Sequence, residues 1–455
     1  MPVLTEEGPM FHESEDEFVV ERRHPSSFRV RRTAFTDPDV YRREQHQIWD
    51  RTWLYVGHTS EVPNNGDFVA RNVAGRPVIM ARGRDGTVRV LFNSCRHRGA
   101  EVCPHERGNS RSFTCPYHAW TYSNTGGLIN IPSQEDFPAD FPKDELGLMS
   151  PAQCDDYRGF VFVCFDPSTQ PLSDYLAGAK EFIDLVVDAS PAGVQIVEGT
   201  HRYGVHANWK LLSENGYDGY HLFPTHRTYL DFMRERGADT KAAGKRYEGS
   251  RALDLGNGHA VTARRQAMFP RLIARWNEVL PEEIRPRIEE RRRELVGRLG
   301  EERALRVAEE SFNMLIFPNL NILGGVTPVV RVLHPAGIDQ IEVTGWCAGY
   351  VDDEPLERKM RLREFLSFWG PAGWATPDDV SILESCQRAY RASREVEWND
   401  ISKGMDREQP DNRDEEQMRV FWRQWQGLMN DSVEFVRPIP QEEAVTLASA
   451  GGAGQ

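Results

Sequence analysis

The spacing of hydrophobic and polar positions divides the chain into segments of different character. The first ~35 residues are polar and mixed in charge, which predicts an arm without a core of its own. A helix is expected next, with Thr36 or Asp37 as its N-cap, Pro38 in its first turn and apolar positions that continue to Trp53. Residues 1–50 are therefore predicted to form an arm and a helix.

Short β-branched and aromatic runs, broken by Gly, Asn and Pro, fill residues 51–168 and predict a small all-β domain. In this segment Asp85-Gly86 is a hairpin turn signal between FVARNVAGRPVIMAR and TVRVLF. From 169 to 445, helical patterns alternate with strand patterns such as NMLIFPNLNILGGV. The mixture predicts a larger α+β domain of antiparallel sheet and helices. Residues 446–455 are expected to be a flexible tail.

The densest charge run, residues 281–310, holds nine Glu and eight Arg at helical spacing. One interpretation is a docking surface for an acidic partner. The other is one or two solvated helices that carry i,i+4 ion pairs, and the near balance of signs favours it.

Composition narrows the class of protein. The chain has 455 residues and a formal net charge of −14, which argues against nucleic acid or an anionic membrane as the main partner. No run approaches the ~18 apolar residues of a membrane span, and MPVLTEEGPMFHESEDEF lacks the pattern of a signal peptide. Seven Cys are too few for a disulfide scaffold. We expect a cytoplasmic globular protein with reduced thiols.

The first cluster of metal-binding residues is Cys95-Arg96-His97 and Cys115-Pro116-Tyr117-His118, with seventeen residues between the two motifs. Two Cys and two His suit a structural zinc site. However, zinc fingers usually pair like ligands at each end, whereas each loop here supplies one Cys and one His. That arrangement suits a Rieske [2Fe–2S] cluster, in which one iron takes two thiolates and the other two imidazoles.

The second cluster is Asp218, His221 and His226. A helix would place Asp218 and His221 on one face, and Pro224 is expected to end that helix. Two His and one carboxylate form the facial triad of non-haem Fe(II) oxygenases. A weaker pair with the same H-x4-H spacing, His201 and His206, lies in a strand-like run and is expected to serve packing only.

These motifs carry a family resemblance. CRHRGAEVCPHERGNSRSFTCPYHAWTYSNTGGL resembles the Rieske domain of aromatic-ring-hydroxylating oxygenase large subunits, with His-Arg-Gly after the first Cys, then Gly-Asn, then Cys-x-Tyr-His-x-Trp. N-W-K-x-x-x-E-N-x-x-D-x-Y-H-x4-H resembles the mononuclear-iron motif of the same family. The resemblance spans roughly residues 40 to 430, and it is closest to the benzoate, toluate, anthranilate and p-cumate branch.

The resemblance implies a role for each motif residue. Cys95, His97, Cys115 and His118 would hold the Rieske cluster, and His221 and His226 would bind the mononuclear iron. Asp218 would be the acid that links the iron site to a Rieske histidine of a neighbouring subunit.

The third iron ligand is expected far downstream, where Gly-Pro-Ala-Gly precedes Asp378-Asp379. The resemblance implies Asp379, with Asp378 as the fallback. Taken alone, the same residues predict a capping box with Thr376 as N-cap and Asp379 at N3. Both roles can coexist, because a helix N-terminus favours a carboxylate.

The family implies a terminal oxygenase that uses O2 to dihydroxylate an aromatic ring, with an aromatic carboxylate as the expected substrate. Two alternatives are a Rieske monooxygenase or demethylase with the same metals, and an electron carrier without catalysis. No dinucleotide or plant-type ferredoxin motif is present, so electrons are expected from a separate NADH-dependent reductase, with or without a ferredoxin. A trimer of large subunits, with or without a small β subunit, is implied.

The substrate pocket is expected to be apolar and aromatic. Its candidate residues are Asn215, Tyr220, Leu222, Phe223, Phe312 and Trp369. Arg227 is a candidate to bind the carboxylate, with a surface role as the alternative. His105 is expected on the surface, and five further cysteines are expected to be small buried hydrophobes: Cys103, Cys154, Cys164, Cys347 and Cys386.

Overall fold

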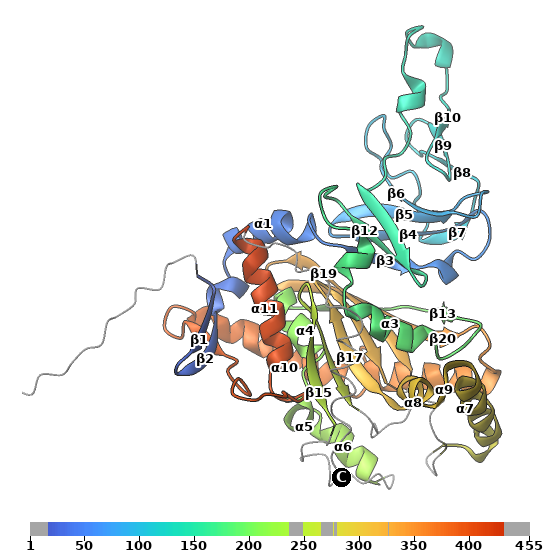
Figure 1. Cartoon of the computed structure of the whole chain (residues 1–455). Helices are drawn as coiled ribbons and strands as arrows, with labels where there is room; N and C mark the ends of the chain where they lie inside the picture. Colours follow the sequence, from blue (N-terminus) through green and yellow to red (C-terminus); the bar gives the residue numbers. More distant parts are fainter. Residues whose placement is uncertain (1–16, 236–248, 265–275, 277–279, 326, 432–455) are drawn as a thin grey trace, which may run out of the picture.

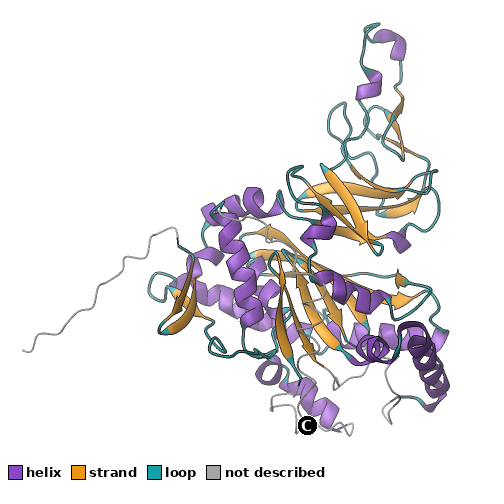
Figure 2. Ribbon diagram, viewed as in Figure 1, coloured by secondary structure: helices purple, strands orange, loops and turns teal. Residues whose placement is uncertain are grey.

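The computed structural model describes residues 17–431 except 236–248, 265–275, 277–279 and 326. The tail predicted at 446–455 lies outside the described residues. Figure 1 shows a β-rich domain above a larger domain in which helices cover a sheet, and Figure 2 separates the two by their content of strands and helices. No helix among the described residues has the length and apolar character needed to cross a bilayer.

The upper domain consists of three small antiparallel sheets. Its strands are β3 (Leu54–His58), β4 (Asp67–Val73), β5 (Arg76–Arg82), β6 (Val88–Phe92), β7 (Arg107–Asn109), β8 (Ser112–Thr114), β9 (Thr121–Ser123), β10 (Leu128–Asn130), β11 (Gln153–Tyr157) and β12 (Phe160–Cys164). The expected hairpin at Asp85-Gly86 is β5–β6, and Gly86 supplies the positive φ of 77° that the turn needs.

The lower domain is built on an eight-stranded antiparallel sheet. Its strands are β13 (Val194–Ile196), β14 (His201–Val205), β15 (Arg251–Gly256), β16 (His259–Arg264), β17 (Ser311–Ile316), β18 (Leu320–Gly324), β19 (Pro328–Gly337) and β20 (Gln340–Tyr350). Together with the upper domain, this sheet and its helices confirm the predicted fold class.

Helices cover both faces of this sheet (Figure 1). The helices of this domain are α2 (Leu172–Tyr175), α3 (Ala179–Val187), α4 (Trp209–Asn215), α5 (Leu222–Thr225), α6 (Arg227–Glu235), α7 (Arg285–Leu299), α8 (Glu301–Glu309), α9 (Pro355–Glu364), α10 (Thr376–Ala389) and α11 (Glu416–Met429), and not all of them touch the sheet. Successive residues of a strand point to opposite faces. Met314 therefore packs in the core with α3 and α8, while Leu315 packs in the core with α4 and α11.

The N-terminal segment corrects the expectation of a simple arm. β1 (Val19–Arg23) and β2 (Ser26–Arg31) form a hairpin, and β2 pairs with β21 (Trp398–Asp400). Phe28 and Val30 are almost fully buried. The alternation of hydrophobic and polar residues in this segment is short and interrupted by charges. The pairing of β2 with the distant strand β21 is therefore what shows that these residues belong to the core.

The helix expected after the arm is shorter than predicted. α1 (Pro38–Glu44) begins at the predicted cap, where the Asp37 carboxylate accepts a hydrogen bond from the Asp39 N–H. The chain continues as a π-helical turn to Trp49, and Trp53 lies just before β3. The helical spacing of apolar residues therefore continues beyond the end of the α-helix.

The charge run forms α7 and α8, as the favoured interpretation predicts. It is not solvated throughout, because Arg291 is 1% exposed and pairs with Glu357 at 2.6 Å. Its guanidinium also lies 3.2 Å from Asp352 and 3.3 Å from Asp353. The charges of α7 thus anchor it to the first turn of α9 and to the segment that precedes that helix.

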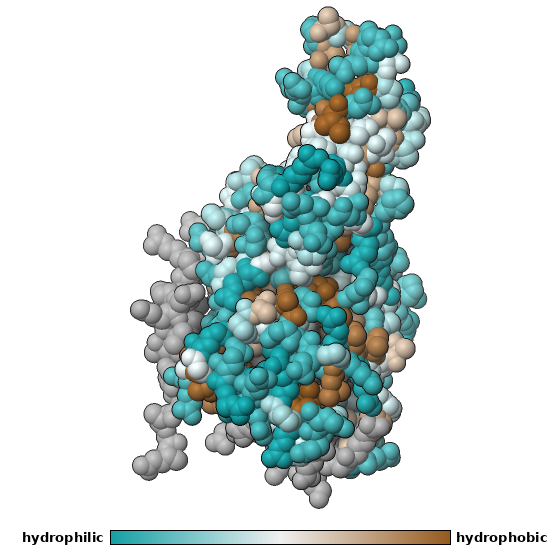
Figure 3. Space-filling model, turned by 90° about the vertical axis from the view of Figure 1, so that its right-hand side faces the viewer, coloured by the Kyte–Doolittle hydropathy of each residue, from teal (hydrophilic) through white to brown (hydrophobic). Residues whose placement is uncertain are grey.

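The remaining cysteines fall into two groups. Cys103, Cys164 and Cys347 are buried, as expected. Cys154 is exposed and Cys386 is half-buried, so the expectation is wrong for Cys154 and holds only in part for Cys386. The face of the molecule in Figure 3 is hydrophilic over most of its area, with hydrophobic groups scattered across it, which is usual for an ordinary protein surface.

Candidate metal centres and substrate pocket

Two loops of the β-rich domain share one backbone design. The Cys95 N–H donates to the Ala100 carbonyl at 2.8 Å, and the Gly99 N–H donates back to the Cys95 carbonyl at 2.9 Å. The second loop repeats this pattern. The Cys115 N–H donates to the Trp120 carbonyl at 2.8 Å, and the Ala119 N–H donates to the Cys115 carbonyl at 3.0 Å. Gly99 and Ala119 both have a positive φ, so two equivalent tight loops present their side chains in the same way.

Each loop presents one Cys and one His toward the other. Cys95 and Cys115 are buried, and the rings of His97 and His118 lie 4.5 Å apart between centroids. His97 stacks on Trp120 with an interplanar angle of 5°, and its Nδ1 is buried with no hydrogen-bond partner in the described part of the chain. Two thiols beside two imidazoles, one of which has an unpartnered buried nitrogen, fit a Rieske cluster.

Desolvation and the nearby His97 and Arg98 hold the pKa of the His118 imidazole below its ordinary value. The neutral imidazole that binds a metal is thereby favoured.

Tyr122 is a site residue that sequence reasoning missed. Its hydroxyl lies 3.2 Å from the Cys95 Sγ and accepts a hydrogen bond from the Arg96 N–H at 3.0 Å. Hydrogen bonds to the sulfurs help to set a cluster's reduction potential. No motif marks this tyrosine, because its role arises from the approach of β9 to the first loop.

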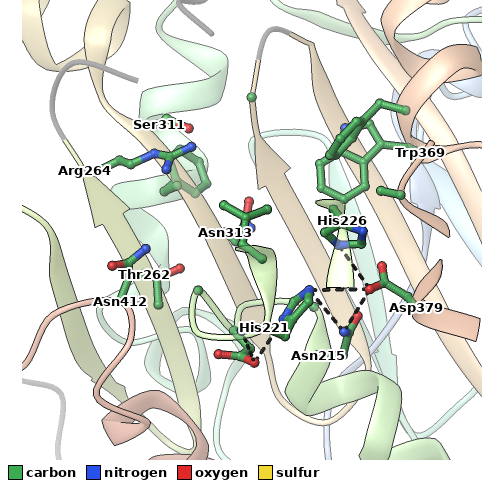
Figure 4. Close-up of a pocket in the computed structure, with 18 of the residues that line it drawn as sticks. Asn215, His221, His226, Thr262, Arg264, Ser311, Asn313, Trp369, Asp379 and Asn412 are labelled. Atoms are coloured by element: carbon green, nitrogen blue, oxygen red, sulfur yellow. Dashed lines mark hydrogen bonds and ion pairs between the residues drawn. The ribbon is translucent and has the colours of Figure 1, made fainter. Parts of the chain in front are cut away.

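The second centre lies in the lower domain. His221 and His226 flank the four-residue helix α5, and Asp379 lies in the first turn of α10. The Asp379 Oδ1 is 3.4 Å from the His221 Nε2 and 3.3 Å from the His226 Nε2 (Figure 4). One ligand atom from each residue lies within 4.8 Å of the others. Two imidazoles and one carboxylate in this arrangement fit a mononuclear non-haem iron.

A second carboxylate lies behind each histidine. The Asp218 Oδ2 is 3.0 Å from the His221 Nδ1, and the Asp378 Oδ2 is 3.5 Å from the His226 Nδ1. Carboxylates in this position fix the tautomer and ring orientation of metal-binding histidines. The fallback ligand Asp378 therefore lies behind His226, outside the group of three ligand atoms.

The charges of the centre are strongly coupled. Burial opposes the imidazolium form of His221, but the hydrogen bonds to Asp218 and Asp379 outweigh it and raise the His221 pKa to about 10. Burial also opposes the charged form of Asp379. The hydrogen bonds and charges of the two histidines outweigh the effect of burial and hold the Asp379 pKa below its ordinary value.

Local structure at the centre differs from the expected helix. Asp218 lies in a bend between α4 and α5, where its carboxylate accepts hydrogen bonds from the Tyr220 and His221 N–H groups at 2.7 and 3.2 Å. Pro224 lies inside α5 rather than ending it. A helix's first turn leaves its N–H groups unpaired, so proline is tolerated there.

Thr376 does not cap α10, because its hydroxyl donates to the Trp369 carbonyl at 2.9 Å and the helix makes no side-chain cap hydrogen bond. The capping-box prediction is wrong. The carboxylate of Asp379 interacts with the two histidines instead.

A pocket opens beside the second centre, lined by all three candidate ligands. Four of the six predicted pocket residues line it: Asn215, Leu222, Phe312 and Trp369. The Asn215 Nδ2 lies 3.4 Å from the His221 Nε2 and donates to the Asp379 Oδ1 at 3.2 Å.

Two pocket predictions are wrong. Tyr220 is 53% exposed and lies beneath the Lys403 ammonium, and Phe223 is not among the lining residues. Both residues lie close to the iron motif along the chain, yet neither side chain is part of the pocket lining, so proximity to the motif was a poor guide.

The pocket also holds polar residues that sequence reasoning missed, because they come from segments far along the chain. Five of them lie in β16, β17 and β19, and Asn412 lies in the loop before α11. They are Thr262, Arg264, Ser311, Asn313, Arg331 and Asn412, and all but Arg331 are labelled in Figure 4. Arg227, the sequence candidate for a carboxylate ligand, is exposed and lies near Asp231, so it has the surface role.

The three histidines outside the motifs for which a position was expected lie as predicted. His201 is in β14 and stacks on Phe365, and His206 and His105 are exposed.

Known proteins share both parts of this chain. Residues 52–142 match the Rieske [2Fe-2S] domain, and residues 196–431 match the ring hydroxylating alpha subunit (catalytic domain). The chain is 34% identical to the 2-halobenzoate 1,2-dioxygenase large subunit of Burkholderia cepacia, over 83% of this chain and 80% of that protein. The chain belongs to the family of ring-hydroxylating oxygenase alpha subunits.

Further relatives agree with this family. The anthranilate 1,2-dioxygenase large subunit of Acinetobacter baylyi is 33% identical, over 84% of this chain and 82% of that protein. A crystal structure of naphthalene 1,2-dioxygenase from Rhodococcus sp. superposes with a TM-score of 0.76 at 29% identity, over 88% of this chain and 94% of that one.

Family membership confirms several predictions. The chain is an oxidoreductase with a Rieske [2Fe–2S] domain and a catalytic domain of the mononuclear non-haem iron type. The resemblance to Rieske dioxygenase large subunits is confirmed, and the halobenzoate and anthranilate relatives agree with the predicted branch. Members of this family act as terminal oxygenases that receive electrons from separate proteins.

Proposed function

We propose that this alpha subunit cis-dihydroxylates the ring of an aromatic carboxylate. The observation that carries the proposal is the triad of His221, His226 and Asp379, which opens into a pocket with aromatic walls and cationic groups. The 2-halobenzoate and anthranilate dioxygenase subunits, with 34% and 33% identity, support an acidic aromatic substrate by their names.

The proposed roles follow the geometry. Cys95, His97, Cys115 and His118 would hold the cluster, and the triad would hold the iron, which activates O2 when bound. Asp218 accepts the His221 Nδ1–H and so fixes the orientation of that ring. Phe312 and Trp369 contribute aromatic surface for a flat substrate, and Asn215 holds the Asp379 carboxylate in place.

Electron delivery is proposed to cross a subunit boundary. Figure 1 shows the cluster-binding part of the β-rich domain, around β8 to β10, and α5 at opposite ends of one chain. Asp218 would therefore contact a Rieske histidine of a neighbouring subunit, in a trimer of large subunits with or without β subunits. A separate NADH-dependent reductase, directly or through a ferredoxin, would supply the electrons.

The test is turnover by the purified oxygenase with a reductase and O2, using benzoate, 2-chlorobenzoate, anthranilate, toluene and naphthalene as substrates. Mass spectrometry of products formed under ¹⁸O2 should show two labelled oxygens in the dihydrodiol of benzoate. The diols of 2-chlorobenzoate and anthranilate lose CO2 together with HCl or ammonia, and two labelled oxygens are then expected in the resulting catechol. A single labelled oxygen would instead identify a monooxygenase, and demethylation of a methoxybenzoate added to the panel would identify a demethylase.

Iron content checks the metal assignment in the same preparation. About three iron atoms per chain are expected, two in the cluster and one in the triad. About two would indicate an electron carrier without a catalytic iron, and zinc in place of iron would contradict both.

A further inference from the structure

One positive charge in the pocket has no partner among the residues that the structure describes. Arg331, in the middle of β19, is 5% exposed and lines the pocket. Its Nε is buried without a hydrogen bond, and its guanidinium forms no ion pair with any carboxylate of the described residues. Arginine keeps its charge in proteins, and a buried charge without a counter-charge is rare.

A second unpartnered group lies beside it. Asn321 pairs with Arg331 across β18 and β19, so the two side chains project from the same face of the sheet. Asn321 is fully buried, and neither its Oδ1 nor its Nδ2 makes a hydrogen bond within the described residues. Buried polar groups in folded proteins almost always have partners, so two adjacent exceptions point to a ligand.

Gly216 packs closely against both polar groups. A Cβ at this position would lie 2.8 Å from the Asn321 Nδ2, 2.9 Å from its Oδ1 and 3.0 Å from an Arg331 Nη. The backbone of Gly216 has φ −59° and ψ −23°, which any residue adopts. Glycine is therefore not needed here for its conformation, and a larger side chain would displace the two polar groups.

The location links this group to the proposed reaction. Gly216 lines the pocket and directly follows Asn215, which contacts both His221 and Asp379. The polar pair thus packs against Gly216, which is adjacent in sequence to a side chain that touches the candidate iron ligands.

Nearby charges leave the guanidinium available to a ligand. Asp218, Glu364 and Asp379 are the acidic residues of the pocket lining, and none of them forms an ion pair with Arg331 among the described residues. Asp218 and Asp379 are engaged with the histidines. Arg264, the other pocket arginine, is half-buried and already interacts with another group.

We propose that Arg331, with Asn321 beside it, binds the carboxylate of the aromatic substrate. The planar guanidinium lines the pocket and offers two parallel N–H donors to a carboxylate, and the fully buried Asn321 next to it adds no competing positive charge. This inference rests on the proposed function and deepens it, because it assigns the acidic half of the substrate to named residues. The ring would then extend from this anchor toward the triad.

The first test compares Arg331→Met with the wild-type holoenzyme on benzoate and on neutral benzamide. Loss of a bidentate charged contact is expected to lower kcat/KM for benzoate roughly 30-fold or more. For benzamide, the change is expected to stay within about threefold. Calorimetric titration with benzoate should show the same loss of affinity without turnover. Equal losses for both compounds would overturn the assignment.

Gly216→Ala is a second and milder variant. Its methyl group would displace Asn321 and Arg331 and should raise KM for benzoate about tenfold, with a smaller effect on benzamide. Gly297→Ala is the matched control, because a Cβ at that site in α7 would meet nothing within 4 Å. It should leave both substrates unaffected. An unchanged benzoate KM in Gly216→Ala would contradict the proposal, even if Arg331→Met did not fold.

Two further outcomes separate this inference from the proposed function. A wild-type enzyme that hydroxylates neutral aromatics but no aromatic acid would overturn the proposed function and the anchor together. A wild-type enzyme that uses benzoate, while Arg264→Met and not Arg331→Met loses it, would overturn only the anchor.

Discussion

Neighbouring aspartates in the first turn of α10 have different tasks. The Asp379 Oδ1 faces the Nε2 atoms of both histidines, whereas the Asp378 Oδ2 lies 3.5 Å from the opposite nitrogen of His226. Residues one apart on a helix point in directions about 100° apart. The rotation places one carboxylate among the candidate metal ligands and the other behind a histidine.

This difference predicts unequal losses of iron. Asp379→Ala should lower the iron content from about three to about two atoms per chain with an intact Rieske absorption spectrum. Asp378→Asn should keep the third iron, with an affinity lowered about 10- to 100-fold, because only the orientation of His226 is disturbed. Iron analysis together with visible absorbance would measure both. Retention of the third iron in Asp379→Ala would contradict the ligand assignment.

At the scale of elements, α7 shows how a charged helix is held on the protein. Arg291 is buried among Asp352, Asp353 and Glu357, while Arg285 on the same helix pairs with Glu282 and Glu289 at the surface. Buried ion pairs are costly to break because the remaining charges lose their partner, whereas exposed pairs contribute little.

Substitution of the two arginines should therefore differ sharply. Arg291→Ala is expected to lower the free energy of unfolding by about 3–5 kcal/mol, because three carboxylates lose a shared counter-charge. The matched variant Arg285→Ala should leave the free energy of unfolding almost unchanged, because its ion pairs are exposed to solvent. Urea denaturation followed by circular dichroism would measure both. Similar losses would show that the buried network does not hold α7.

For the whole molecule, the separation of the two candidate centres matters most. Within one chain the cluster loops and α5 lie at opposite ends (Figure 1), whereas electron transfer requires them close together. A neighbouring subunit in a ring can bring its cluster to the first subunit's Asp218. Each proposed catalytic unit would then contain residues from two chains.

Mixed assemblies test that arrangement. One variant, Cys115→Ser, should lack the cluster, and the other, His221→Ala, should lack the mononuclear iron, so each alone should be inactive. Co-expressed, they are expected to regain a fraction of wild-type turnover, because an intact cluster in one subunit would lie beside an intact iron in the next. Activity that stays at the background of either variant alone would contradict electron transfer between subunits.

Local motifs made most of the chemistry predictable. Cys and His at the spacing of residues 95–97 and 115–118 lie on two short loops, and their backbone bonds are formed within each loop. Likewise His221 and His226 flank one short helix, so their separation depends on only a few residues. The domain order and fold class were predictable for a similar reason, because hydrophobic periodicity reports the local element.

Contacts between distant segments were less predictable. The hairpin β1–β2 looked like an arm because β21, its partner strand, lies more than 350 residues away. Thr376 looked like a helix cap from its sequence context. Its hydroxyl instead donates to the Trp369 carbonyl, a contact that the sequence pattern does not show. Tyr122 carried no signal at all. In each case the partner, and not the residue itself, defines the role.

By itself, the sequence determined the two metal-binding motifs, the order of the domains and their β-rich and α+β character. Only the tertiary structure decided which polar side chains meet in the pocket. Arg331 follows His226 by more than a hundred residues and lies in a strand whose other residues are mostly buried. The hydrophobic pattern of that strand predicts burial, but it does not show whether a carboxylate lies near the arginine. Its significance comes from its place in the pocket lining, from Asn321 on the adjacent strand and from Gly216, which packs closely against both. Periodicity depends on neighbours along the chain, whereas the polarity of a pocket depends on neighbours in space.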